Sequence, residues 1–165
     1  MPYTFISFIN FWIWSFAWST SKEVFNCVAI SNTSHGLYTA LTSPKVSNCT
    51  IISTGNIALY PPTNAVWSAG GYIKGCVIES KLNTSGGHAL YFIGNTATSA
   101  DFEILNNSFK VANASAFCIG YVGGSPATRN MNYANNSFSG STTPVSATII
   151  QGISNTSDSQ GNILL

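Results

Sequence analysis

The feature that most constrains the fold of this chain is an internal repeat, in which a short turn is followed by an apolar strand. Five segments share this pattern and align with one another: residues 25–28, 47–51, 74–78, 106–111 and 135–138. One column of the alignment holds Asn26, Asn48, Gly75, Asn107 and Asn136, and the next column holds Cys27, Cys49, Cys76, Ser108 and Ser137. Successive positions in the first column are 22, 27, 32 and 29 residues apart. Such unequal spacing excludes a strict hexapeptide solenoid and suits coils of three short strands joined by loops of different lengths.

The residue types in these two columns have a physical reason. Asn and Gly tolerate the left-handed backbone conformation that a sharp bend between strands requires. We therefore predict that the first column forms a ladder of turns, stacked about 4.8 Å apart per coil. The small Cys or Ser that follows is predicted to point inward, so that Cys27, Cys49 and Cys76 form a stack of buried thiols rather than disulfides.

Two further sets of apolar segments support the repeat. One set follows the turns, at residues 36–38, 57–60, 89–92, 116–119 and 147–150, and the other precedes the later turns, at residues 66–67, 102–105 and 131–133. These segments are short and rich in aromatic and β-branched residues, which favours strands. The sequence therefore predicts an all-β solenoid domain of about five coils over residues 24–165.

The motifs NCTIIS at residues 48–53, GCVIES at residues 75–80 and NNSFKV at residues 106–111 resemble a known turn-and-strand signature. It is that of the single-stranded right-handed parallel β-helix family, which includes pectate lyases and phage tailspikes. The resemblance covers roughly residues 24–155 and concerns the fold. It implies a short right-handed parallel β-helix with an N-terminal cap over its open end. It does not imply one function, because this fold hosts many.

The N-terminal residues 1–23 form a second predicted unit, a cap or anchor segment. Residues 5–18 read FISFINFWIWSFAW, and we predict a capping helix over residues 4–19. A strand is the alternative, because the even positions from 6 to 18 are apolar except Asn10. On a helix, Phe8, Trp12 and Phe16 would cover the coil end. Aromatic residues also fall on the other side, and we predict that this second group contacts another subunit, a shell protein or a membrane interface: Phe11, Trp14 and Trp18.

Charge is scarce in this chain. Charged residues make up 7% of the sequence and the formal net charge is +1. No basic run is present, so we expect no nucleic-acid partner. A surface with so little self-repulsion tolerates close neighbours, which favours assembly; a neutral secreted protein is the alternative. The four cysteines form no CxxC or Cys/His cluster, so we expect no metal and no cofactor.

A catalytic constellation is not evident in the sequence. Glycosidases need two carboxylates facing one substrate, and the resemblance to pectate lyases raises that chemistry. The only acidic cluster that the repeat could bring together consists of Asp101, Glu103 and Glu79. His35 and His88 precede two of the strand segments without an evident Ser or Cys partner. We therefore predict that the chain is not an enzyme.

These observations predict a non-enzymatic structural or assembly protein in a virion or in the extracellular space. A capsid decoration, a fibre or a tail component fits, with the N-terminal aromatic segment binding other copies of the chain or other shell or fibre subunits. The alternative is an extracellular glycan-binding or glycan-cleaving β-helix module. Its candidate stacking platforms are Tyr60, Trp67, Tyr72, Tyr91 and Tyr121.

Overall fold

The regular structure of this chain is entirely β within the residues that can be described. The computed structural model describes residues 7–9, 23–38, 45–60, 62–63, 71–94, 102–122, 131–146 and 163–164. These residues contain strands and turns and no helix, and every strand pair in them is parallel. The prediction of an all-β protein is confirmed.

The strands form three sheets. Sheet A has the order β1 (Ser7–Ile9), β3 (Val28–Ser31), β6 (Thr50–Ser53), β10 (Val77–Ser80), β13 (Ser108–Val111), β16 (Ser137–Ser139) and β17 (Ile163–Leu164). Sheet B has the order β15 (Met131–Ala134), β12 (Phe102–Leu105), β9 (Gly71–Lys74), β5 (Lys45–Ser47) and β2 (Glu23–Phe25). Sheet C has the order β14 (Ile119–Val122), β11 (Leu90–Gly94), β7 (Leu59–Tyr60) and β4 (Leu37–Tyr38), and β8 (Pro62–Thr63) also pairs with β11.

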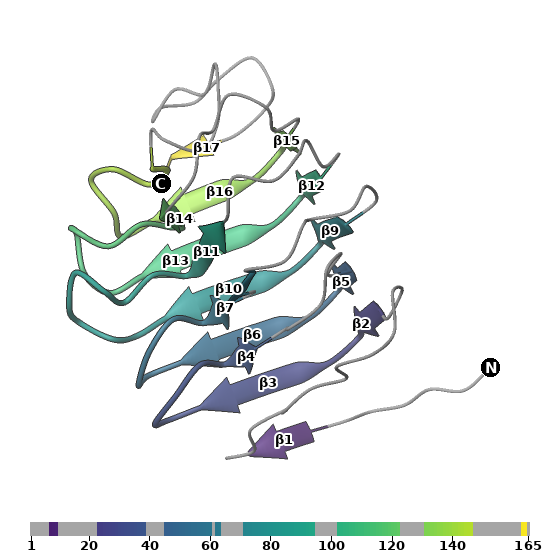
Figure 1. The fold of residues 1–165 in the computed structure, drawn as a ribbon, viewed down its shortest axis with the longest axis horizontal. Helices are drawn as coiled ribbons and strands as arrows, with labels where there is room; N and C mark the ends of the chain where they lie inside the picture. Colours follow the sequence, from purple (N-terminus) through teal and green to yellow (C-terminus); the bar gives the residue numbers. More distant parts are fainter. Residues whose placement is uncertain are drawn as a thin grey trace.

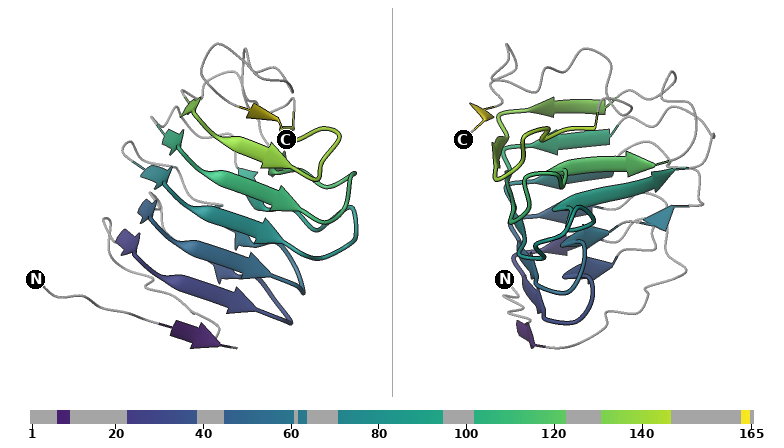
Figure 2. Two further views of the ribbon diagram at one scale, coloured as in Figure 1. Left: turned by 180° about the vertical axis from the view of Figure 1, so that it is seen from behind. Right: turned by 90° about the vertical axis from the view of Figure 1, so that its left-hand side faces the viewer.

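The chain visits the three sheets in a fixed order. It passes from sheet B to sheet A to sheet C in β2–β3–β4 and repeats this order in β5–β6–β7, β9–β10–β11 and β12–β13–β14. β15 and β16 begin a fifth round. Figures 1 and 2 show the resulting stack, which rises strand by strand from the purple β1 to the yellow β17. This arrangement is consistent with a β-helix-like solenoid.

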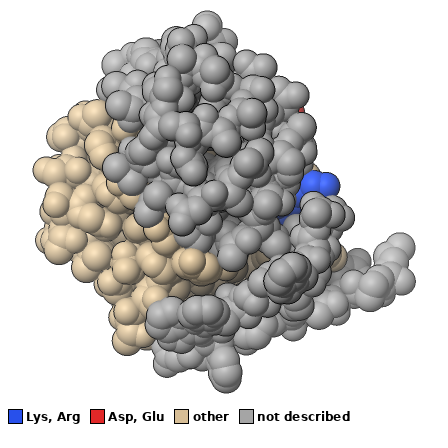
Figure 3. All heavy atoms as spheres, in the orientation of Figure 1, with Lys and Arg blue, Asp and Glu red and all other residues tan. Residues whose placement is uncertain are grey.

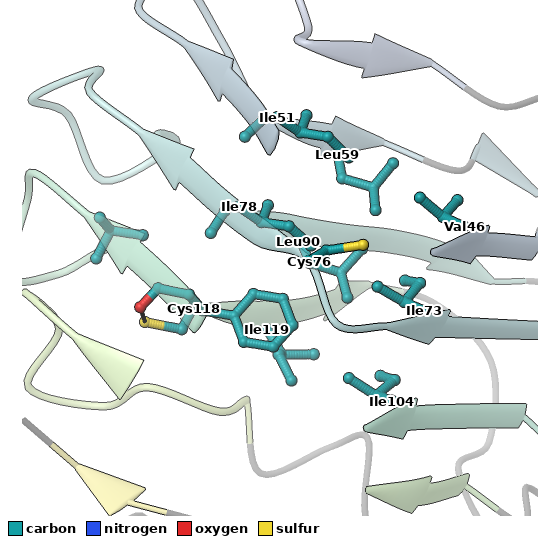
Figure 4. Close-up of a cluster of buried hydrophobic side chains, with 14 of the residues drawn as sticks. Val46, Ile51, Leu59, Ile73, Cys76, Ile78, Leu90, Ile104, Cys118 and Ile119 are labelled. Atoms are coloured by element: carbon teal, nitrogen blue, oxygen red, sulfur yellow. Dashed lines mark hydrogen bonds between the residues drawn. The ribbon is translucent and has the colours of Figure 1, made fainter. Parts of the chain in front are cut away.

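The core consists of side chains that all three sheets direct into one interior. Alternate residues are buried in most of the strands whose side chains are described, as expected when successive side chains point to opposite faces of a sheet. Figure 4 shows the labelled residues of this core converging from the three sheets. Sheet A contributes Ala29, Ile51, Ile78, Phe109 and Phe138; sheet B contributes Val46, Ile73 and Ile104; sheet C contributes Leu37, Leu59, Leu90 and Ile119. A slip of one residue would turn each set outward, so the apolar alternation fixes the register.

The predicted turn ladder is correct in its first three positions and wrong by one residue in the last two. Asn26, Asn48 and Gly75 have φ values of 51°, 52° and 64°, but the next two left-handed residues are Asn106 and Asn135, at 59° and 57°. Backbone hydrogen bonds link these turns along the stack. They run from Asn26 N to Ser47 O, Asn48 N to Lys74 O, Gly75 N to Leu105 O and Asn106 N to Ala134 O.

Asn107 and Asn136 instead continue the cysteine column, so placing Ser108 and Ser137 in that column was also wrong. Ser108 pairs in register with Val77 and Ser137, on the outward side of sheet A. The physical reason is the Asn-Asn pair, whose two members serve different purposes. The first residue adopts the left-handed conformation, and the second is buried and satisfies backbone groups with its amide.

The N-terminal helix is wrong at residues 7–9, which form the strand β1. Ser7, Phe8 and Ile9 pair in parallel with Val28, Ala29 and Ile30 of β3. A strand satisfies the N–H and C=O groups along the edge of sheet A, which a helix laid across the end would leave unpaired. The rest of the predicted helix, including Phe11, Trp14 and Trp18, lies outside the described residues. The described residues include no helix of the length and apolar character needed to cross a membrane.

Candidate functional site

The most unusual surface of the described structure is an apolar area on the outer face of sheet A and the adjoining corner. Its members, which we call the contact surface, are Phe25, Val28, Ile30 and Val77, with exposed fractions of 50%, 39%, 38% and 47%. Val28 and Val77 lie in one register row, on either side of Thr50. The half-buried Ile52 lies beside Ile30 in the next row.

The contact surface arises because β3 and β10 carry apolar residues at outward as well as inward positions. In β3 the inward residues are Ala29 and Ser31, while Val28 and Ile30 face out. Parallel sheets with apolar residues on both faces are usually covered on both faces. Large β-branched side chains left exposed on such a sheet therefore make this face a candidate binding surface.

The same face of sheet A becomes polar toward the C-terminal strands. The row that holds Val28, Thr50 and Val77 continues with Ser108 and Ser137. In the neighbouring row Glu79 forms an ion pair with Lys110, with 3.4 Å between Oε1 and Nζ. The contact surface thus ends at β10. Figure 3 shows one face of the molecule, on which the described residues display little charge and the blue basic atoms are confined to the right-hand edge.

Two of the five candidate glycan contacts, Tyr60 and Tyr91, lie together on sheet C. Leu59 pairs in register with both Leu37 and Leu90, so the tyrosines that follow form one outward column: Tyr38, Tyr60 and Tyr91. Histidine rings stack on two of these tyrosines. The His35 ring stacks on the Tyr60 ring at 4.6 Å between centroids, and the His88 ring stacks on the Tyr91 ring at 4.4 Å.

The Tyr91 ring also packs closely against Gly120. A Cβ atom added at Gly120 would lie 2.4 Å from Cδ2 of Tyr91, so this ring lies against the glycine backbone. A sugar needs a free ring face for stacking, and a histidine occupies one face of Tyr60 and one face of Tyr91. The column therefore reads as an aromatic stack that joins successive coils.

Two of the remaining glycan candidates, Tyr72 and Tyr121, do not join this column. Tyr72 lies on sheet B, where its hydroxyl donates a hydrogen bond of 2.7 Å to Glu23 and Lys74 Nζ lies 4.8 Å from the ring centroid. The hydrogen bond lowers the pKa of Glu23 and raises the pKa of Tyr72 to about 12. Tyr121 belongs to β14, and Trp67 lies outside the described residues. The five candidates therefore do not form one platform.

The acidic cluster considered from the sequence does not form among the described residues. Glu79 belongs to β10 in sheet A and Glu103 to β12 in sheet B, and each has its own lysine partner, Lys110 and Lys74. Along sheet B, Glu23 and Glu103 stand three strand spacings apart, roughly 14 Å between backbones, and their carboxylates are engaged by Tyr72 and Lys74 respectively. Asp101 and Asp158 lie outside the described residues.

The two histidines act as parts of the turn before sheet C. His88 Nδ1 accepts a hydrogen bond of 2.9 Å from the backbone N–H of Phe117, and burial lowers the pKa of His88. Burial also lowers the pKa of His35. Among the described residues no group of three or more His, Cys, Asp or Glu side chains could hold a metal ion.

The contact surface is the feature that the sequence analysis missed. Its signal was present, because the segments around Val28 and Val77 are apolar at consecutive positions rather than strictly alternating. Comparison of the chain with protein-family models, curated proteins and solved structures gives no match. Functional inference therefore rests on the residues themselves.

Proposed function

We propose that this chain is a non-enzymatic structural protein that assembles through the contact surface. The single observation that carries the proposal is the exposure of Phe25, Val28, Ile30 and Val77 on a parallel sheet. Burying such side chains removes apolar area from water at roughly 25 cal/mol per Å², which is the main driving force for association. The charged residues, only 7% of the sequence, provide little opposing repulsion.

The proposal includes a closed, right-handed parallel β-helix as the scaffold. Four complete rounds through the three sheets in one order support closure. The right-handed sense follows from the strong preference of parallel crossover connections for that hand. A rigid coil that presents one apolar face suits a repeated building block such as a capsid decoration, a fibre or a tail component in a virion or outside the cell. The N-terminal aromatics Phe11, Trp14 and Trp18 would extend the contact.

The test is the oligomeric state of the full chain by analytical ultracentrifugation at micromolar concentrations. We expect the wild type to self-associate and the double variant Val28→Lys, Val77→Lys to remain monomeric. The matched control is Ser108→Lys, Ser137→Lys, because these four residues share one register row of sheet A. The control adds the same charge to the polar half and should associate like the wild type.

Two outcomes would contradict the proposal. One is a wild type that stays monomeric throughout this concentration range. The other is equal loss of association in both double variants, which would point to net charge rather than to the contact surface. Circular dichroism of each variant checks that the β-structure is retained.

The glycan-binding alternative has less support, because its candidate tyrosines already contact other side chains. Tyr60 and Tyr91 stack on histidines, and Tyr72 is held by Glu23 beneath Lys74. If the wild type bound a glycan array and the Tyr60→Ala variant did not, glycan binding would become the preferred function.

A further inference from the structure

The interior corner between sheets B and A carries a stack of thiols. Cys27, Cys49 and Cys76 occupy equivalent positions in three successive coils, directly after the turn residues Asn26, Asn48 and Gly75. All three are free thiols. Cys49 and Cys76 are 2% and 1% exposed, whereas Cys27, in the first of these coils, is only half-buried. Solvent therefore reaches the stack at Cys27, its N-terminal member, but not at Cys49 or Cys76.

The sulfur atoms of the first pair lie within contact distance. Cys27 Sγ lies 3.1 Å from Cys49 Sγ. Cys76 Sγ instead accepts a hydrogen bond of 3.5 Å from the backbone N–H of Cys49. Neighbouring strands place equivalent Cα atoms about 4.8 Å apart, within the range that a disulfide can span.

We propose that Cys27 and Cys49 form an oxidation-sensitive pair, which a small-molecule disulfide such as oxidised glutathione converts into a covalent bridge between the first two coils. Cys27 reacts first because solvent reaches it. Cys49 then resolves the intermediate, because it is buried beside Cys27 and beyond the reach of the reagent. Cys76 stays reduced, because it lies behind Cys49.

The two steps balance as thiol–disulfide exchange. The Cys27 thiolate attacks one sulfur of the reagent, RSSR, forming a mixed disulfide and releasing one thiolate, RS⁻. The Cys49 thiolate then attacks the Cys27 sulfur, forming the Cys27–Cys49 bond and releasing the second RS⁻. The protons of the two protein thiols end on two RSH molecules. The protein is thereby oxidised by two electrons, and the reagent is reduced by two.

The electrostatics of the stack affect the two steps differently. The hydrogen bond to the Cys49 sulfur, together with burial, raises the pKa of Cys27, and the same interactions raise the pKa of Cys76. The neighbouring thiols of Cys27 and Cys76 both lower the pKa of Cys49, which favours the thiolate at the resolving position. The first attack should therefore limit the rate, and bridge formation should accelerate as pH rises from 7 to 9.

The bridge would pin the coil that carries three members of the contact surface. Phe25, Val28 and Ile30 flank Cys27 in sequence, and the bridge ties this corner to the corner between β5 and β6. The thiol chemistry itself does not depend on the proposed assembly function, since it is measured on the chain alone.

The experiment incubates the reduced full-length chain with oxidised glutathione, unfolds it, labels the remaining thiols with a maleimide and maps the peptides by mass spectrometry. We expect two of the four thiols to disappear and one cross-linked peptide to join Cys27 to Cys49. The oxidised form should melt on the order of 5–10 °C higher than the reduced form. Two outcomes overturn the proposal in the wild type: all four thiols remain labelled, or the cross-link joins Cys49 to Cys76.

Two variants serve as matched controls. Cys118→Ser removes a thiol from another part of the core, where Sγ lies 3.6 Å from Ser139 O, and should form the bridge like the wild type. Cys27→Ser should keep its three remaining thiols under the same conditions. Equal loss of thiols in Cys27→Ser would overturn the assignment of Cys27 as the entry point. A glutathione adduct on wild-type Cys27 that never resolves would exclude Cys49 as the resolving thiol.

Discussion

The N-terminal and C-terminal halves of the stack differ inside and outside, and both differences fall between β10 and β13. Inside, the corner column changes from Cys27, Cys49 and Cys76 to Asn107 and Asn136. Outside, the face of sheet A changes from apolar Val28 and Val77 to Ser108 and Ser137. Equivalent positions of the repeat are thus occupied by different residue types in the N-terminal and C-terminal coils.

The interior difference is one of interaction strength. Asn107 Nδ2 donates to Ile73 O at 2.9 Å, and Asn107 Oδ1 accepts from Cys76 N at 2.9 Å. Asn136 Oδ1 in turn accepts from Asn107 N at 3.0 Å. Thiols at the same position supply weak hydrogen bonds and behave mainly as small apolar groups. The C-terminal coils are therefore joined by full amide hydrogen bonds, and the N-terminal coils by packing and sulfur contacts.

Together the two differences suggest that the two halves of the stack have different roles. The C-terminal half has amide hydrogen bonds in its interior corner and polar residues on its outer face. The N-terminal half has a softer interior and an apolar exterior, which suits a region that completes its burial against another molecule. Four predictions test this difference between the two halves.

The largest effect is expected from truncating the amide ladder. Asn107→Ala leaves the buried Cys76 N–H and Ile73 C=O without their side-chain partner, which should lower the free energy of unfolding by about 3 kcal/mol. Cys76→Ala, one coil earlier in the same column, removes a buried sulfur and the weak hydrogen bond that it accepts from Cys49 N, and should cost about 1 kcal/mol. Urea unfolding of both variants measures the difference. Equal losses would show that the two halves of the column are equivalent.

Gly75→Ala tests the turn column and should cost about 1–2 kcal/mol. Gly75 has a φ of +64°, and an added Cβ would lie 2.7 Å from Asn48 Oδ1. The backbone conformation accounts for most of the cost, because the Asn48 amide can move aside. Gly75→Asn restores the residue type of the other four turns and should be closer to neutral. A larger loss for Asn than for Ala in thermal melts would refute this account.

Acidification should weaken the junction between the halves through His88. Its Nδ1 accepts the N–H of Phe117, which joins the third coil to the fourth, and only an unprotonated Nδ1 can accept. Burial lowers the pKa of His88 below its ordinary value of 6.5, so folding favours the neutral form. The corresponding stability is complete above about pH 6.5 and is lost as pH falls from there toward the folded-state pKa. Urea midpoints between pH 8 and pH 5 measure the slope, which His88→Gln should reduce.

The sequence predicted the fold class and most of the column positions because both depend on local rules. Asn26, Asn48 and Gly75 could be found since a left-handed turn admits few residue types. The same rule could not choose between the members of an Asn-Asn pair, where the deciding factor is which amide is buried. Burial depends on neighbouring coils, which a single segment does not reveal.

Register in sheet C could not be predicted for a related reason. The structure pairs Leu90 with Ile119. Residues 116–119 are all apolar, so the period-two signal that fixes register is missing there. The N-terminal segment was ambiguous in the same way, with apolar residues compatible with both helix and strand, and pairing with β3 decided it at residues 7–9.

The smallest effect on stability, and the sharpest test of the exterior, is expected from Val77→Thr. Val77 is 47% exposed on β10, and threonine keeps the β-branched shape that suits a strand. The free energy of unfolding of the monomer should therefore change by no more than about 0.5 kcal/mol. Binding of a hydrophobic dye should fall, because a hydroxyl replaces a methyl group at the β10 end of the contact surface. Ser108→Thr, in the same register row but on the polar half, should change neither quantity. If Val77→Thr instead lowers the stability of the monomer by more than 1 kcal/mol, this side chain supports its own coil, and the apolar face belongs to the fold rather than to a partner.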